Sequence, residues 1–250
     1  MRVHGFLWLA LLLAAGCGAA PRPAPPQQRA DACAGGPFEV HHARARLARS
    51  GATAGVRRRL DPVAWYPVRR GCRFPLLVFS HGHYGSPAVC EQLCARLASR
   101  GFVVVGVRHA DRATPRRLQG PERVEDVLFL LDHLPAVARG AGPLGVFGHS
   151  FGGRTAAEVA SQDPRVRALV TMAGGADRAS TAQIRAPTLM VAGGADTVDP
   201  PGLSEASVRA LPRGTPHALL VVPDAGHGDL LRSSVVERRV AAHFAAYLRS

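Results

Sequence analysis

The sequence contains no lysine, so all 31 basic side chains are arginines, and together with 18 acidic residues they give a formal net charge of +13. Apart from Arg2, these arginines are spread from Arg22 to Arg249. They do not form one basic stripe with interleaved aromatic residues, the pattern typical of nucleic-acid binding. We therefore predict a solvated basic surface and no nucleic-acid partner. A general attraction to anionic surfaces stays open.

The sequence also has no HExxH motif and no paired CxxC motifs, the spacings with which proteins commonly hold zinc. Five of the 11 histidines fall where predicted strands end, so a metal site at that edge is an alternative: His81, His83, His109, His149 and His227. Without a ligand-spacing motif we predict neither a metal nor another cofactor.

No apolar run is long enough to span a bilayer as a mature helix. The run at 6–15 follows Arg2 and ends within Ala14-Ala15-Gly16-Cys17, an arrangement that resembles a bacterial lipoprotein signal. We expect residues 1–16 to be removed and Cys17 to carry a lipid anchor, with plain secretion as the alternative. Both predict an exported protein, periplasmic or extracellular.

With 250 residues, of which 47% are hydrophobic, the chain fits one domain with a sizeable core. Residues 17–36 consist mostly of Ala, Pro, Gln and Gly and predict a flexible linker, which leaves 37–250 as the catalytic domain. Four further cysteines allow three disulfide pairings. Cys90 and Cys94 lie in a helical apolar pattern, so Cys33–Cys72 is the favoured bridge.

Two stretches, 38–47 and 60–66, predict an antiparallel pair of strands. Short apolar runs then alternate with helical patterns, which indicates a parallel sheet buried on both faces. The strands are expected at Leu76–Phe79, Val103–Val107, Leu144–Phe147, Ala168–Met172, Thr188–Ala192 and Ala218–Val222. The helices are expected at Ala88–Arg100, Glu122–Leu134, Phe151–Gln162, Leu203–Leu211 and Ser233–Leu248, with a small one at Thr181–Ile184. The fold class is α/β, with eight strands, helices on both faces and no cap domain.

The residues after the strand at 144–147 read Gly148-His149-Ser150-Phe151-Gly152-Gly153, and a helical pattern follows. This strand, GxSxG and helix order is the nucleophile elbow, in which glycines leave room for a sharp turn that projects the serine hydroxyl. Ser150 is the predicted nucleophile. A glycine-rich phosphate-binding turn is the alternative, but the Walker lysine that it requires is missing.

Further segments carry a resemblance: Gly36-Pro37-Phe38, Trp65-Tyr66-Pro67, 75–82, Arg108-His109-Ala110-Asp111, Arg123-x-x-Asp126 and 148–153. Together they resemble the bacterial α/β hydrolases related to dienelactone hydrolase and platelet-activating-factor acetylhydrolase, over residues 36–250. Dienelactone hydrolases have a cysteine nucleophile, whereas this chain has Ser150. The resemblance therefore implies hydrolysis of ordinary carboxylic esters.

A serine nucleophile needs a base that is held by an acid, and in this fold the order along the chain is Ser, acid, His. Asp196 lies in Gly193-Gly194-Ala195-Asp196 after a strand and resembles the family's acid, although Asp199 in the same loop is an alternative. His227 follows the last predicted strand in a Gly-His pair. We predict the triad Ser150, Asp196 and His227.

The tetrahedral intermediate needs backbone N–H donors. Phe151 follows the nucleophile and provides one, and by resemblance to a His-Gly-x-x-Gly loop His83 provides the other, with Tyr84 second. Tyr84, Phe151 and a loop at 108–119 are expected to line the pocket. The arginines of that loop either favour acidic substrates or form a solvated surface: Arg112, Arg116 and Arg117.

The predicted function is ester hydrolysis through an acyl-enzyme on Ser150, acting as a monomer on small-molecule or lipid-like esters. A lidless polyester hydrolase or cutinase-like enzyme is the nearest variant, because the short 172–188 connection leaves the cleft open. Amide or peptide hydrolysis by the same triad is one alternative. A lipid-tethered binding protein without activity is another.

Overall fold

The computed structural model describes residue 33 and residues 36–52, 55–69 and 71–249. The described part is built on an eight-stranded sheet with the order β1-β4-β6-β5-β7-β8-β9-β10. Its strands are β1 (Val40–Arg44), β4 (Val63–Pro67), β5 (Leu76–Ser80), β6 (Val103–Val107), β7 (Leu144–His149), β8 (Val166–Met172), β9 (Thr188–Gly193) and β10 (His217–Val222). Strand β4 pairs antiparallel with β1 and β6, and the other pairs are parallel. The chain therefore has the α/β-hydrolase fold class.

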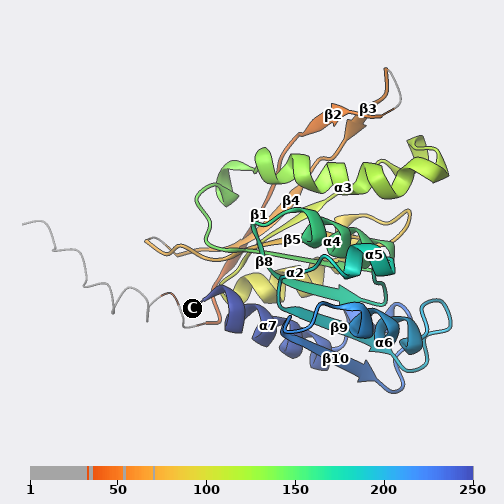
Figure 1. Cartoon of the computed structure of the whole chain (residues 1–250). Coiled ribbons are helices and arrows are strands. Elements are labelled where there is room, and N and C mark those ends of the chain that lie inside the picture. The colour runs from red at the N-terminus through yellow and green to blue at the C-terminus, as the bar shows by residue number, and fades with distance from the viewer. Residues whose placement is uncertain (1–32, 34–35, 53–54, 70, 250) are drawn as a thin grey trace, which may run out of the picture.

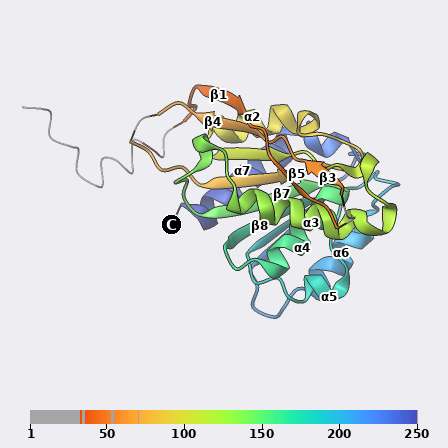
Figure 2. The same ribbon diagram turned by 90° about the horizontal axis from the view of Figure 1, so that it is seen from above.

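Helices cover both faces of this sheet (Figures 1 and 2). Helices α2 (Glu91–Ser99) and α7 (Ser234–Leu248) pack on one face, and α3 (Arg116–Asp132), α4 (Phe151–Gln162) and α6 (Pro201–Ala210) on the other, with α5 (Arg178–Thr181) beside α4 and α6. Short 3₁₀ turns lie at Pro87–Cys90, Asp111–Ala113, Ala136–Ala138 and Asp229–Leu231. Alternate residues of β5 enter the two layers, Val78 one and Leu77 the other, as the two-residue period of a strand requires.

The predicted antiparallel pair and the six later strands are confirmed. The helices differ at their ends: α3 begins at Arg116 and continues through Pro121, α2 begins at Glu91 after a 3₁₀ turn, and α5 ends at Thr181. The early start of α5 follows from Asp177, whose carboxylate accepts the amides of Ala179 and Ser180 as a helix cap. The 172–188 connection is fully described and holds α5 alone, so no cap domain is inserted there.

A second, two-stranded sheet was not predicted. It pairs β2 (Ala48–Ser50) with β3 (Arg57–Arg59) and projects from the body beyond α3 (Figure 1). Its arginines reach back to the helix, because Arg49 and Arg58 both donate to Asp126 of α3. The hairpin is therefore fastened by ion pairs.

Cys33 and Cys72 form a disulfide, as predicted, and Cys90 and Cys94 are buried free thiols. The proposed signal peptide and Cys17 lie outside the described residues, as does most of the linker. Within the described part, no helix combines the length and the apolar character needed to cross a membrane.

Candidate active site

Ser150 occupies a sharp turn between the end of β7 and the start of α4. Its backbone angles are φ 58° and ψ −129°, a conformation that non-glycine residues rarely adopt and that concentrates at functional sites. A Cβ on Gly152 would lie 2.0 Å from the carbonyl oxygen of Ser80, and one on Gly148 would lie 2.1 Å from that of Gly152. Only glycine fits these positions, so the GxSxG spacing has a steric cause.

Asp196 and His227 come together from the loops after β9 and β10. Nδ1 of His227 lies 2.8 Å from Oδ2 of Asp196, and the Asp196 side chain is fully buried. The His227 side chain is 23% exposed and can meet a substrate. Ser150 and His227 are both described, and no hydrogen bond joins their side chains; catalytic contacts of this kind often tighten only when substrate is bound.

The two acids of this loop differ in their surroundings. Burial raises the pKa of Asp196, but hydrogen bonds from the Asp199 amide, His227 and the Val198 amide outweigh it and leave the pKa below its ordinary value. Burial and the Asp196 charge raise the pKa of Asp199, whose buried Oδ2 has no hydrogen-bond partner. Asp196 is therefore the acid suited to hold a base.

His149, next to the predicted nucleophile, supports the histidine loop. Its Nε2 donates to the backbone carbonyl of His227 at 2.7 Å, and the two rings lie 4.8 Å apart. Burial lowers the pKa of His149 and keeps its ring neutral. The hydrogen bond ties the end of β7, directly before Ser150, to the loop that carries His227.

The two predicted oxyanion donors come from different segments, the start of α4 and the loop after β5. Phe151 is the first residue of α4, where the backbone N–H has no partner within the helix. His83 follows β5, and a Cβ on its neighbour Gly82 would lie 3.4 Å from Cβ of Ser150. The amide of Tyr84, the second choice, donates to Oδ2 of Asp111 at 3.2 Å. This leaves His83 as the stronger candidate.

An aromatic wall lies beside Ser150, formed by His83, Tyr84 and Phe151. The His83 ring stacks on Tyr84 at 3.9 Å and meets Phe151 edge-on at 5.4 Å. Tyr84 is 44% exposed, and the guanidinium of Arg112 lies 5.6 Å from its ring centre. Arg116 and Arg117 belong to the first turn of α3 and not to a loop, because the helix begins before Pro121.

The five histidines form separate contacts. His81 faces His109 at 5.0 Å and His149 faces His227, while His83 joins the aromatic wall. In the described part of the chain, no group of three or more His, Cys, Asp or Glu side chains is arranged to hold a metal ion.

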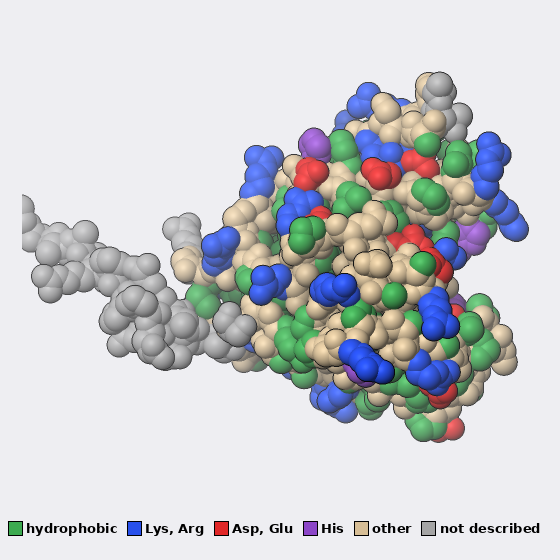
Figure 3. All heavy atoms as spheres, viewed as in Figure 1, with side chains coloured by type: hydrophobic (Ala, Val, Ile, Leu, Met, Phe, Trp, Pro, Cys, Tyr) green, Lys and Arg blue, Asp and Glu red, His purple; other side chains and the backbone are tan. Residues whose placement is uncertain are grey.

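The basic side chains on the face shown in Figure 3 are spread out and do not form a single stripe.

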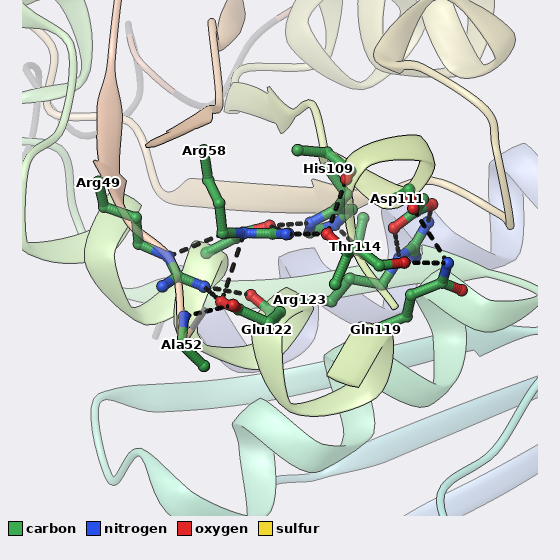
Figure 4. A network of polar contacts seen from close by, with 12 residues as sticks. Arg49, Ala52, Arg58, His109, Asp111, Thr114, Gln119, Glu122 and Arg123 are labelled. Carbon is green, nitrogen blue, oxygen red and sulfur yellow. Dashed lines mark hydrogen bonds and ion pairs between the residues drawn. The ribbon is translucent and has the colours of Figure 1, made fainter. Parts of the chain in front are cut away.

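Sequence reasoning missed a buried network of charged groups behind the site (Figure 4). It joins two arginine–carboxylate pairs, Arg58 with Asp126 and Arg123 with Asp111, and all four side chains are at most 2% exposed. The sequence contains one signal of this network: the Arg123-x-x-Asp126 motif and Asp111 belong to the segments that carry the family resemblance. The sequence alone assigns them no role. Periodicity cannot show which buried charges pair.

The sequence matches the PET hydrolase-like (PETase) family model over residues 17–227. The chain belongs to the PET hydrolase-like family. It is 28% identical to cutinase est1 of Thermobifida alba over 224 residues, which cover 86% of this chain and 70% of that protein. It is 32% identical to the bis(hydroxyethyl) terephthalate hydrolase of Streptomyces coelicolor over 161 residues, 62% of this chain and 50% of that protein. Cutinase cut1 of Thermobifida fusca is 29% identical over 174 residues, 66% of this chain and 50% of that protein.

This PET hydrolase-like protein is a carboxylic ester hydrolase of the serine-hydrolase type. That finding favours an enzyme over the non-catalytic binding protein. The resemblance to dienelactone hydrolase and platelet-activating-factor acetylhydrolase stays a similarity of motifs. The matched segments span between half and 70% of these three relatives.

Proposed function

We propose that the protein hydrolyses carboxylic esters with Ser150 as nucleophile, His227 as general base and Asp196 as the acid that orients it. The observation that carries this proposal is the 2.8 Å contact between Asp196 and His227, on loops beside a strained serine elbow. A buried, ionised Asp196 favours the tautomer of His227 with the proton on Nδ1, so that Nε2 is free to accept one.

In the first half-reaction, Ser150 Oγ attacks the ester carbonyl carbon and its proton passes to Nε2 of His227. The amides of His83 and Phe151 donate to the resulting oxyanion. Collapse of this intermediate breaks the bond to the alcohol oxygen, which takes the proton from His227 and leaves. Water then attacks the acyl-enzyme by the same route in reverse, which releases the acid and restores Ser150.

We further propose an extended ester with an aromatic acid component, such as a polyester chain end, as the substrate class. The aromatic wall beside Ser150 supports it, because offset rings stack favourably. The missing cap leaves room for a chain that continues beyond the cleft. The similarity to the bis(hydroxyethyl) terephthalate hydrolase of Streptomyces coelicolor also supports this class.

Two substrate series test this function. We expect the full chain to hydrolyse p-nitrophenyl esters from acetyl to palmitoyl and to release terephthalate monoester from bis(hydroxyethyl) terephthalate, with no turnover by Ser150→Ala. Turnover of aliphatic esters alone would refute the proposed aromatic substrate class but would leave the proposed triad intact. A folded wild-type enzyme that cleaves only anilide analogues would instead support the amidase alternative.

For the whole chain we propose a signal peptide at 1–16 that is removed on export, and an exported monomer with a linker at 17–36 and the catalytic domain at 37–250. Cys17 is the proposed lipidation site, supported by the small residues before it. A Cys17→Ser variant should then move from the membrane fraction to the soluble exported fraction. A wild-type protein whose mature form starts beyond Cys17 would refute the anchor.

A further inference from the structure

One side chain, Arg123 of α3, holds the backbone beside the nucleophile. We name residues 81–84 the oxyanion loop. Nη1 of Arg123 donates to the carbonyl of His81 at 2.7 Å, and Nη2 donates to the carbonyl of Gly82 at 2.9 Å. The Arg123 side chain has no exposed surface. One buried guanidinium therefore bonds two successive peptide units of the oxyanion loop, and the Gly82 carbonyl also accepts Nδ1 of His81 at 2.7 Å and the Gly85 amide at 3.1 Å.

This grip sets the direction of the His83 amide. The carbonyl of Gly82 and the N–H of His83 belong to the same peptide unit, and in a planar trans peptide these two bonds point in opposite directions. Because the Gly82 carbonyl faces Arg123, the His83 N–H faces away from α3. In the described part of the chain, no acceptor takes this N–H. The cation on the carbonyl also polarises the peptide and strengthens its N–H as a donor.

Asp111 fixes both Arg123 and the next amide of the loop. Its two oxygens accept from Nε and Nη2 of Arg123 at 2.9 and 2.7 Å. Oδ2 also accepts the amide of Tyr84, which has a positive φ of 54°. The Tyr84 amide is thus engaged on the Arg123 side, and the His83 amide is left for a ligand.

Arg123 also contacts the residue of the second proposed donor. Its guanidinium carbon lies 4.6 Å from the ring centre of Phe151, and the His83 side chain is tied down by a 2.6 Å hydrogen bond between Nε2 and Oε1 of Gln119. We propose that Arg123, held by Asp111, is a positioning residue that aims the His83 amide at the oxyanion. This assignment rests on the proposed function of Ser150.

The molecule contains its own matched control (Figure 4). Arg58 is also a buried arginine, 1% exposed, and its Nε and Nη2 donate to the two oxygens of Asp126 at 2.8 and 2.5 Å. Arg58 pairs with the carboxylate of Asp126, just as Arg123 pairs with that of Asp111. Among the described residues, however, Arg58 makes no hydrogen bond to the oxyanion loop. Removal of either pair deletes a buried ion pair, and only the removal of Arg123 takes away side-chain hydrogen bonds to the loop backbone. Asp126 also accepts Arg49 and His109, and it reaches the loop only through the contact of His109 with the His81 ring.

The experiment compares two double variants of the full chain, Arg123→Met with Asp111→Asn and Arg58→Met with Asp126→Asn. Circular dichroism checks folding, and kcat and KM are measured on p-nitrophenyl butyrate. A trifluoromethyl ketone, which forms an oxyanion on the serine, is measured as an inhibitor. Loss of one oxyanion donor lowers kcat about 100- to 1000-fold; for a misaimed donor we expect about 10- to 100-fold, with KM little changed and Ki raised by a similar factor.

The Arg58 double variant should keep kcat and Ki within about threefold of wild type, although it too loses a buried pair. Equal losses in both double variants, or an unchanged Ki in the Arg123 one, would overturn the assignment. Arg123→Lys serves if the double variants do not fold, because it keeps a cation beside Asp111. It should also lose kcat at constant KM, and an unchanged kcat would overturn the assignment as well.

The outcome for the proposed function is separate. An inactive wild-type enzyme, or activity that survives in Ser150→Ala, would refute the triad and the role of Arg123 with it. An active wild-type enzyme with an inactive Ser150→Ala and equal losses in the two double variants would refute the role of Arg123 alone.

Discussion

Nδ1 of His227 lies 2.8 Å from Oδ2 of Asp196, while the other oxygen of Asp196 accepts the amides of Val198 and Asp199 at 2.8 and 2.9 Å. Both carboxylate oxygens of Asp196 are thus hydrogen-bonded, and these bonds hold the side chain in one orientation. Asp199, three residues on, has a buried oxygen with no partner. The loop therefore contains one acid that is held in place and one that is not.

This difference predicts opposite results for two single substitutions. Asp196→Asn should lower kcat about 10⁴-fold, because an amide favours the wrong tautomer of the base. Asp199→Asn should change kcat less than about fivefold and should not destabilise the fold, because it replaces an unpaired buried carboxyl. Kinetics on p-nitrophenyl butyrate measures both. A larger loss from Asp199→Asn than from Asp196→Asn would reverse the assignment.

Two glycines near Ser150 should respond differently to substitution by alanine. A Cβ on Gly82 meets Ser150 and His149 at 3.4 and 3.5 Å, which are ordinary contact distances, whereas a Cβ on Gly152 would lie 2.0 Å from a backbone oxygen. We expect Gly82→Ala to fold with a near-normal melting temperature and at least about tenfold lower kcat/KM, because the methyl group fills space beside the nucleophile. Gly152→Ala should not give folded protein. A fully active Gly82→Ala would show that substrate approaches from elsewhere.

The disulfide closes a loop with a sequence separation of 39 residues. Chain-entropy arguments assign a loop of this length about 4 kcal/mol of stability. We expect the paired variant Cys33→Ser with Cys72→Ser to melt about 10 °C lower than wild type. Dithiothreitol should lower the wild-type melting temperature in the same way and leave the variant unchanged. A wild type indifferent to reductant would contradict this role.

Buried histidines should make the fold sensitive to mild acid. Burial is the main cause that lowers four histidine pKa values in the folded state: His81 to about 3, His109 and His243 to about 4, and His149 by direction alone. Below the ordinary value of 6.5 the unfolded chain binds protons that the folded chain does not, so stability falls as the pH falls toward 4.

We expect the melting temperature to drop by about 10 °C or more between pH 7.5 and pH 4.5. His243→Gln should show a smaller drop than wild type, and the exposed His41→Gln an equal one. Asp126 does not contribute in this window: burial raises its pKa, but Arg58 and His109 outweigh that effect and lower it to about 2, so its stabilisation is lost only below its ordinary pKa. A constant melting temperature across the window would contradict neutral buried histidines.

The sequence predicted the central sheet well, because its inner parallel strands are short apolar runs buried on both faces, as in Val103–Val107. It also predicted that Ser150, Asp196 and His227 follow strand ends, as they do after β7, β9 and β10, and their catalytic roles stay predictions. It failed where charge replaces hydrophobicity as the organising force. The strand at Arg57–Arg59 has no apolar residue, and Arg58 is buried only because Asp126 and Glu122 lie opposite. The helix at 122–134 was likewise predicted to begin too late, because Gly120 and Pro121 are poor helix formers, whereas α3 begins at Arg116.

The central claim is that Ser150 is the nucleophile, and covalent labelling tests it most directly. The full chain is treated with a fluorophosphonate, digested, and the modified residue identified by mass spectrometry, with Ser150→Ala in parallel. We expect one adduct on Ser150, loss of esterase activity in proportion to labelling, and neither labelling nor turnover in Ser150→Ala. Ester hydrolysis that persists in Ser150→Ala, or an adduct on another residue, would contradict the claim.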